Sequence, residues 1–116
     1  MSDRELLELA AKAAEIETKS DEHGLMTMAS GLFQVAWNPL QNDGDALRLA
    51  VKLRIKLNRE INCGCDIVEA IGPEDDNMSC HCSTESIEGD PYAATRRAIV
   101  RAAAEIGRQM QEGGAA

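Results

Sequence analysis

The fold is decided by a stretch in the middle of the chain, DGDALRLAVKLRIKL (residues 43–57). Asp43 and Asp45 place carboxylates where the positive end of a helix dipole would lie, and apolar residues follow at helical spacing. From Leu53 onward apolar and basic residues alternate, which is the period of a β-strand. The sequence therefore predicts a helix from Asp43 to near Leu53 and a strand from about residue 55. The buried side of that helix is expected to consist of Ala46, Leu47, Ala50, Val51 and Leu53.

A helix is expected at each end of the chain. Ser2 and Glu5 form a capping box that begins a helix over 3–17. Asp90 and Pro91 begin the last helix, which runs to a disordered tail at 113–116. Apolar runs and turn residues predict further strands at 25–29, 32–37, 61–71 and 78–87, with a loop at 18–24.

These elements predict a single domain, residues 1–116, of the α+β class. We expect a mixed, mostly antiparallel sheet of about four or five strands, with amphipathic helices packed on it as in an α-β-α sandwich. The chain is 44% hydrophobic and 28% charged, as in ordinary globular proteins. It has no apolar run long enough to cross a membrane and no pattern of a secretory signal peptide.

The charge of the chain is unevenly distributed. The net charge is −8, and residues 61–90 contain eight acidic residues and no basic one. Because phosphate attraction supplies most of the affinity for duplex nucleic acid, we expect no such partner. The acidic segment serves either solubility or contact with a basic surface of another protein. The residues expected to contact that partner are Glu74, Asp75, Asp76, Glu85 and Glu88.

The last helix carries a basic stripe on an otherwise acidic protein. Arg97, Arg101 and Arg108 lie within about 40° of one another around the helix axis. Because a guanidinium matches phosphate or carboxylate groups, one hypothesis is an anion-binding groove for a nucleotide or an acidic tail. The alternative is a solvated helix face whose arginines pair with Glu105 and with the acidic segment at 61–90.

The four cysteines form two C-x-C units, Cys63 with Cys65 and Cys80 with Cys82. On neighbouring strands, a register that pairs Cys63 with Cys82 and Cys65 with Cys80 would bring all four thiols to one face. Four thiolates suit tetrahedral zinc, although a flat strand spaces them widely unless a bulge intervenes. The alternatives are reduced structural thiols, which a reducing cytosol would maintain, and disulfides.

No set of residues typical of an active site is present. His23 and His81 have no partners resembling a nucleophile–base arrangement, and no phosphate-binding or EF-hand loop occurs. We therefore expect a protein that is not an enzyme and has no cofactor, unless the cysteines bind zinc.

The composition favours a homodimer. The chain has one Phe, one Trp and one Tyr but 17 alanines, so its core offers little apolar area. The last helix is expected to bury Tyr92, Ile99, Ala103, Ile106 and Met110 against the sheet. Ala94, Ala98 and Ala102 then form a ridge on a second side, which a two-fold helix pair would cover.

Three segments resemble a known group of proteins: LLELA (6–10), WNPL followed by DGDALRLA (37–40 and 43–50), and AATRRAIVRAA (93–103). They are similar to small phage and prophage accessory proteins of the α-β-α sandwich domain group, which includes NinX-like proteins of lambdoid phages. The resemblance implies a non-catalytic phage protein in the host bacterial cytoplasm that binds a host macromolecule during host takeover or defence evasion. The alternatives are a binder that sequesters a host nucleotide signal and a small zinc-stabilised module.

Overall fold

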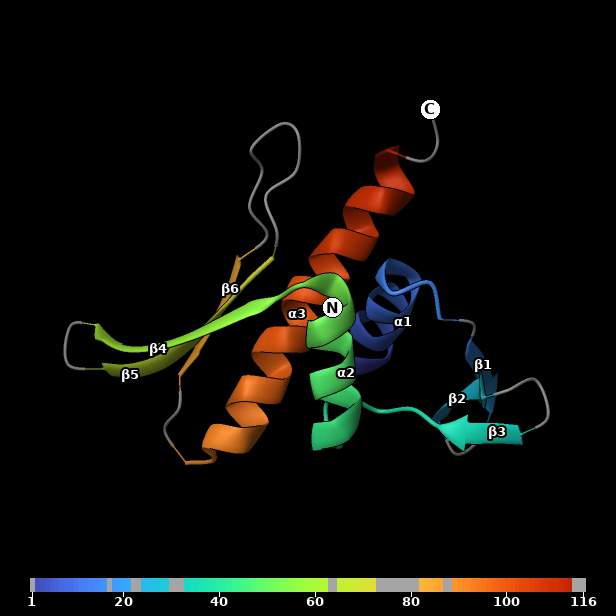
Figure 1. Cartoon of the computed structure of the whole chain (residues 1–116), viewed down its shortest axis with the longest axis horizontal. Helices are drawn as coiled ribbons and strands as arrows, with labels where there is room; N and C mark the ends of the chain where they lie inside the picture. The colour runs from blue at the N-terminus through green and yellow to red at the C-terminus, as the bar shows by residue number, and fades with distance from the viewer. Residues whose placement is uncertain are drawn as a thin grey trace.

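The structure is a computed structural model of the chain that describes residues 2–16, 18–21, 24–29, 33–62, 65–72, 82–86 and 89–113. Within these ranges it contains helices and strands that alternate in groups along the chain (Figure 1). In chain order they are α1 (Asp3–Ala13), β1 (Thr18–Asp21), β2 (Gly24–Ala29), β3 (Phe33–Ala36), α2 (Asp43–Leu53), β4 (Lys56–Asn62), β5 (Cys65–Ile71), β6 (Cys82–Ser86) and α3 (Pro91–Gly113).

The strands form two separate antiparallel sheets with orders β1-β2-β3 and β4-β5-β6. The α+β class is confirmed, but the prediction of one mixed sheet of four or five strands was wrong. Figure 1 shows the reason: the helices lie between the two groups of strands, so β3 and β4 cannot pair. Each sheet is therefore built from strands that are neighbours in the sequence.

The first sheet contains the two strands predicted at 25–29 and 32–37 and one strand that the sequence did not reveal. β2 and β3 pair from Met26 with Ala36 to Ala29 with Phe33, as expected for the segments at 25–29 and 32–37. β1 occupies most of the predicted loop at 18–24 and pairs with β2. Its sequence, TKSD, has no apolar alternation, so this strand depends on backbone hydrogen bonds to its neighbour.

Local capping groups begin the helices largely as predicted. The Ser2 hydroxyl oxygen accepts a hydrogen bond from the Glu5 amide at 3.2 Å. The Asp90 carboxylate accepts two, from the amides of Tyr92 and Ala93 at 3.0 and 3.1 Å. For α2 the cap is Asn42, one residue before the predicted Asp43, because its side-chain oxygen accepts from the amide of Asp45.

Two left-handed residues end the first two helices. Glu15 has a φ of 57°, and α1 ends at Ala13 rather than at the predicted residue 17. Arg54, also at a φ of 57°, follows α2, whose predicted end at Leu53 is confirmed. Residues other than glycine adopt this left-handed conformation at an energetic cost. At Arg54 it produces a sharp change of direction between α2 and β4.

The last helix is the centre of the molecule and contacts α1, α2, β5 and β6. The backbones of α1 and α3 approach each other so closely that a Cβ atom added at Gly107 would lie 2.0 Å from the carbonyl oxygen of Leu9. Ala98 lies about 180° around the helix from Gly107 and is also fully buried. The helix is thus covered on two opposite sides within one chain.

This burial removes the argument for a dimer through the alanine ridge. Ala98 and Ala102 are buried inside the chain, so no second copy is needed to cover them. The predicted core face is right for Ile99 and Ala103, whereas Tyr92 and Met110 at its two ends are exposed. The helix is longer than the layer that it packs against, so its ends project into solvent (Figure 1).

Candidate functional site

The arginine stripe of α3 is occupied by carboxylates of the chain itself. Arg101 Nη1 lies 2.6 Å from Glu85 Oε1, and Arg108 pairs with Glu105. Arg97 Nη2 lies 3.3 Å from Asp3 Oδ1. These contacts agree with the prediction of a paired helix face. The alternative of an anion-binding groove stays a prediction, and each guanidinium would first have to leave a carboxylate.

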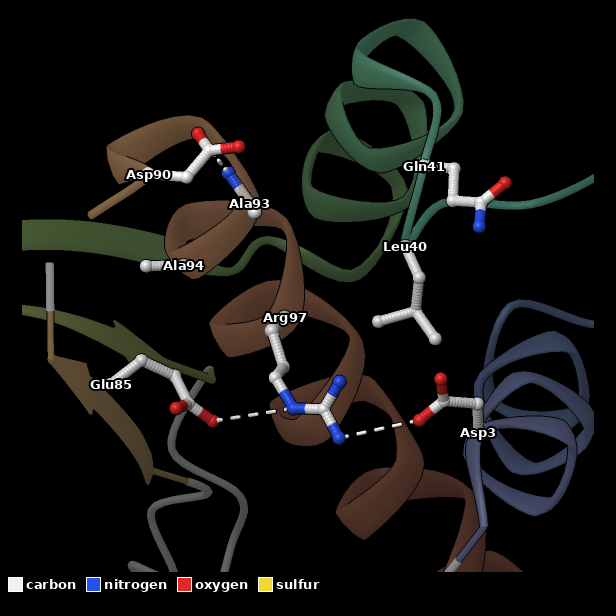
Figure 2. Close-up of a pocket in the computed structure, with 8 residues that line it drawn as sticks. All are labelled: Asp3, Leu40, Gln41, Glu85, Asp90, Ala93, Ala94 and Arg97. Atoms are coloured by element: carbon white, nitrogen blue, oxygen red, sulfur yellow. Dashed lines mark hydrogen bonds and ion pairs between the residues drawn. The ribbon is translucent and has the colours of Figure 1, made fainter. Parts of the chain in front are cut away.

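A pocket of about 370 Å³ lies where the starts of α1 and α3 meet the segment before α2 (Figure 2). Arg97 lies across it, between Glu85 on one side and Asp3 on the other, at 4.0 and 3.3 Å. Its walls contain three carboxylates and one guanidinium, a balance that repels a phosphate group. The lining residues are Asp3, Leu40, Gln41, Glu85, Asp90, Ala93, Ala94 and Arg97.

The residues predicted to contact a basic partner are divided by the structure. Glu85 lies on β6 and faces α3, where Arg97 and Arg101 compensate its charge. It is therefore part of the contact between the sheet and the helix. Glu74, Asp75, Asp76 and Glu88 lie outside the described residues.

The register of the second sheet differs from the one predicted for the cysteines. Cys65 begins β5 and pairs with Asn62 of β4, whereas Cys82 begins β6 and pairs with Ile71 at the other end of β5. Along the sheet, Cys82 therefore lies six residue positions from Cys65. At about 3.3 Å per residue this separation is roughly 20 Å, and the sheet does not have the register in which Cys82 would face Cys63. Cys63 and Cys80 lie outside the described residues, and so do the side chains of all four cysteines. Zinc binding stays a prediction, and within the described ranges no group of His, Cys, Asp and Glu could hold a metal.

Two large apolar side chains are exposed on α2. Leu47 is 63% exposed and Val51 is 70% exposed, although both were predicted to be buried. Leu49 takes the buried position instead, together with Ala46 and Ala50. The signal in the sequence was the width of the apolar arc, which covers about 200° around the helix, whereas one buried face needs roughly half of that.

Basic side chains flank the exposed apolar pair on one side of the helix and at its C-terminal end. Arg48 and Lys52 follow Leu47 and Val51 along α2, and Arg54 caps the helix, all of them exposed. Arg48 contacts Asp45 at 3.2 Å and remains open to solvent. We call these five residues, Leu47, Arg48, Val51, Lys52 and Arg54, the α2 surface.

The exposed region continues from the α2 surface into β4. All residues from Lys56 to Ile61 are exposed, and Ile61 is 76% exposed. The face of β5 that carries the buried Val68 continues into β4, because Val68 pairs with Arg59. Figure 1 shows why it is uncovered there: the β4–β5 hairpin extends outward past the helices.

One ion pair lies on this uncovered part of the sheet. Arg59 Nη2 donates to Asp66 Oδ2 at 2.7 Å, and Arg59 Nε donates to Oδ1 at 3.2 Å. This bidentate pair of hydrogen bonds from Arg59 holds the pKa of Asp66 below its usual value. The same contact raises the pKa of Arg59, so both groups stay charged near neutral pH.

Comparison of the chain with protein-family models, with curated proteins and with solved structures found no match. The resemblance to phage accessory proteins therefore stays a prediction. None of the helices in the described ranges combines the length and apolar character that crossing a membrane requires.

Proposed function

We propose that this protein is a non-catalytic binding protein that docks on a partner protein through the α2 surface. The observation that supports the proposal is the exposure of Leu47 and Val51, one helical turn apart, beside three cationic side chains. Leucine and valine each contribute about 1.5–3 kcal/mol when they are removed from water. Two such residues on one turn form an anchor that a partner helix or loop can cover.

The chemistry of the surface indicates an acidic partner segment with apolar side chains. Arg48, Lys52 and Arg54 form a basic rim on a chain whose net charge is −8. The rest of the protein therefore repels acidic molecules, whereas this rim attracts them and orients them during approach. The partner thus differs from the basic surface that the acidic segment at 61–90 suggested.

The resemblance of residues 6–10, 37–50 and 93–103 to phage accessory proteins supports a bacterial host protein as the partner, met in the host cytoplasm. In that setting a small protein changes the activity of its target by covering a surface.

Site-specific photo-cross-linking tests this proposal. A photoreactive amino acid is placed at Val51 in one protein and at Tyr92, which is 71% exposed on α3, in a matched control. Both are mixed with lysates of candidate bacterial hosts and irradiated. We expect an adduct from position 51 that is absent from position 92, and its cross-linked peptide should be acidic and contain apolar residues. Adducts that are the same from both positions, a basic peptide, or no adduct from position 51 would each overturn the proposal.

The captured protein then allows a direct measurement of the basic rim. Lys52→Glu should weaken binding about tenfold and reduce its dependence on salt. Lys12→Glu makes the same charge change on the exposed side of α1 and should leave the dissociation constant within about twofold. An equal loss in both variants would show that net charge, and not the α2 surface, controls binding.

A further inference from the structure

The outer edge of β4 has no partner strand among the residues that the structure describes. β4 lies at the edge of its sheet, and in the described part of the chain it pairs only with β5. Its pairing with β5 is continuous from Lys56 opposite Ile71 to Asn62 opposite Cys65, without a bulge. The strand also contains no proline. A long, regular strand of this kind presents unpaired backbone donors and acceptors that another strand can use.

The charges on β4 are complementary to a second copy of β4 in the antiparallel direction. If Asn58 lies opposite Asn58 of the second copy, then Lys56 lies opposite Glu60 of the second copy. The two-fold symmetry repeats this pair on the other side. Opposite charges at directly facing positions stabilise a strand pair, and like charges destabilise it.

In the same register, the face of β4 that carries Leu57, Arg59 and Ile61 brings apolar side chains of the two copies together. Leu57 lies opposite Arg59 of the second copy and diagonal to Leu57 and Ile61 of the second copy. The charge of Arg59 is already compensated by Asp66 of its own chain at 2.7 Å. Four exposed apolar side chains, two from each copy, therefore meet on the face that continues from the buried Val68.

The neighbouring registers lack this complementarity. A shift of the second copy by two residues is the smallest that keeps the faces matched, and it places Lys56 opposite Asn62 and Glu60 opposite Asn58, so no opposite charges face each other. A further shift of two residues places Glu60 opposite Glu60. Moving it the other way leaves only the three residues from Lys56 to Asn58 in the ladder. Registers centred on Ile61 and Asn62 retain only three residues and one residue of β4 in the ladder. Among the registers that a two-fold axis allows, the charges of β4 and the length of the ladder together select the one centred on Asn58.

We propose that the protein is a homodimer in which the two β4 strands pair antiparallel about a two-fold axis at Asn58. The two sheets then form one continuous sheet of order β6-β5-β4-β4-β5-β6. Because Arg54 links α2 directly to β4, the two α2 surfaces are carried on either side of the shared strands. The dimer would therefore present two copies of the surface to partners, although dimerisation does not depend on the proposed function.

A charge-swap series tests the register. Sedimentation at micromolar concentration should show a dimer for the wild-type chain. Glu60→Lys places lysines opposite each other twice and should raise the dimer dissociation constant about tenfold or more. The double variant Lys56→Glu with Glu60→Lys restores opposite charges and should recover the wild-type constant. Glu5→Lys, on the exposed side of α1, controls for the change in net charge.

A photoreactive amino acid at Asn58 provides a second measurement that does not depend on these variants. Irradiation should give a covalent dimer from position 58 and none from Tyr92. Circular dichroism confirms that each charge variant is folded. A wild-type chain that stays monomeric, a Glu60→Lys variant that dimerises normally, or a folded double variant that does not recover would overturn the proposal. Binding to the partner captured at Val51 is measured separately, so failure of one proposal leaves the other standing.

Discussion

Replacing Gly107 with alanine tests the close contact between α1 and α3. The added Cβ atom would lie 2.0 Å from the carbonyl oxygen and 2.8 Å from the carbonyl carbon of Leu9. These are backbone atoms, so the two helices must separate to make room. Overpacking of this kind costs about 1–3 kcal/mol, occasionally more, while alanine gains about 1 kcal/mol in helix propensity. Because the overlap is severe, we expect a net loss of about 2 kcal/mol in the free energy of unfolding.

Urea unfolding followed by circular dichroism measures this loss, and thermal unfolding should show a midpoint about 8 °C lower. The matched control is Gly44→Ala in α2. There the added atom meets Asn42 Oδ1 at 3.2 Å and the Arg48 guanidinium nitrogens at 3.3 and 3.5 Å, which are side-chain atoms that need give way by only a few tenths of an ångström. The control should lower the free energy of unfolding by no more than about 0.5 kcal/mol, and helix propensity can raise it by up to about 1 kcal/mol. A Gly107→Ala protein as stable as the wild type would refute the close contact.

Three further substitutions test local interactions. Arg96→Ala removes the guanidinium that donates to the carbonyl oxygen of Leu40 at 2.9 Å. Because this half-buried oxygen loses a charged partner, the free energy of unfolding measured in urea should fall by about 2 kcal/mol. Arg59→Gln should raise the pKa of Asp66 toward its usual value, since the hydrogen bond from Arg59 lowers it, and NMR titration of the carboxyl carbon measures the change. Because the folded pKa of Asp66 is lowered, the stabilisation by this pair is present above the unfolded pKa and lost as the pH falls through the folded one. Asp90→Ala removes the acceptor of two amides and should cost about 1 kcal/mol in thermal unfolding, whereas Asp90→Asn should retain most of that stability.

The parts of the fold that depend on nearby residues were predictable from the sequence. Ser2 and Asp90 cap helices through amides two or three residues away, and the change from helix to strand near Leu53 follows from the spacing of apolar residues. The division into two sheets was not predictable, because strand pairing is set by contacts between distant segments. β1 was missed for the same reason, since its polar residues carry no period.

The candidate site was harder to predict because exposure depends on what covers each element. The apolar arc of α2 was visible in the sequence, but the choice of Leu49 over Leu47 and Val51 as the buried side follows from where α3 lies. Arg48, Lys52 and Lys56 are spaced four residues apart and would lie on one face only if the helix continued past Leu53. The left-handed Arg54 ends it instead and divides them between a helix and a strand.

The alanine-rich contact between α1 and α3 also affects the heat capacity of unfolding. Newly exposed apolar surface raises that heat capacity by about 0.45 cal/mol/K per Å², and exposed backbone lowers it. α1 and α3 are in contact, and their buried residues include Ala10, Ala103 and Gly107, so the contact buries much backbone and little side-chain area. Scanning calorimetry should therefore give a value per residue below the usual range of about 12–15 cal/mol/K. The resulting stability curve is flat, so the folded population changes little between a cold environment and a warm one.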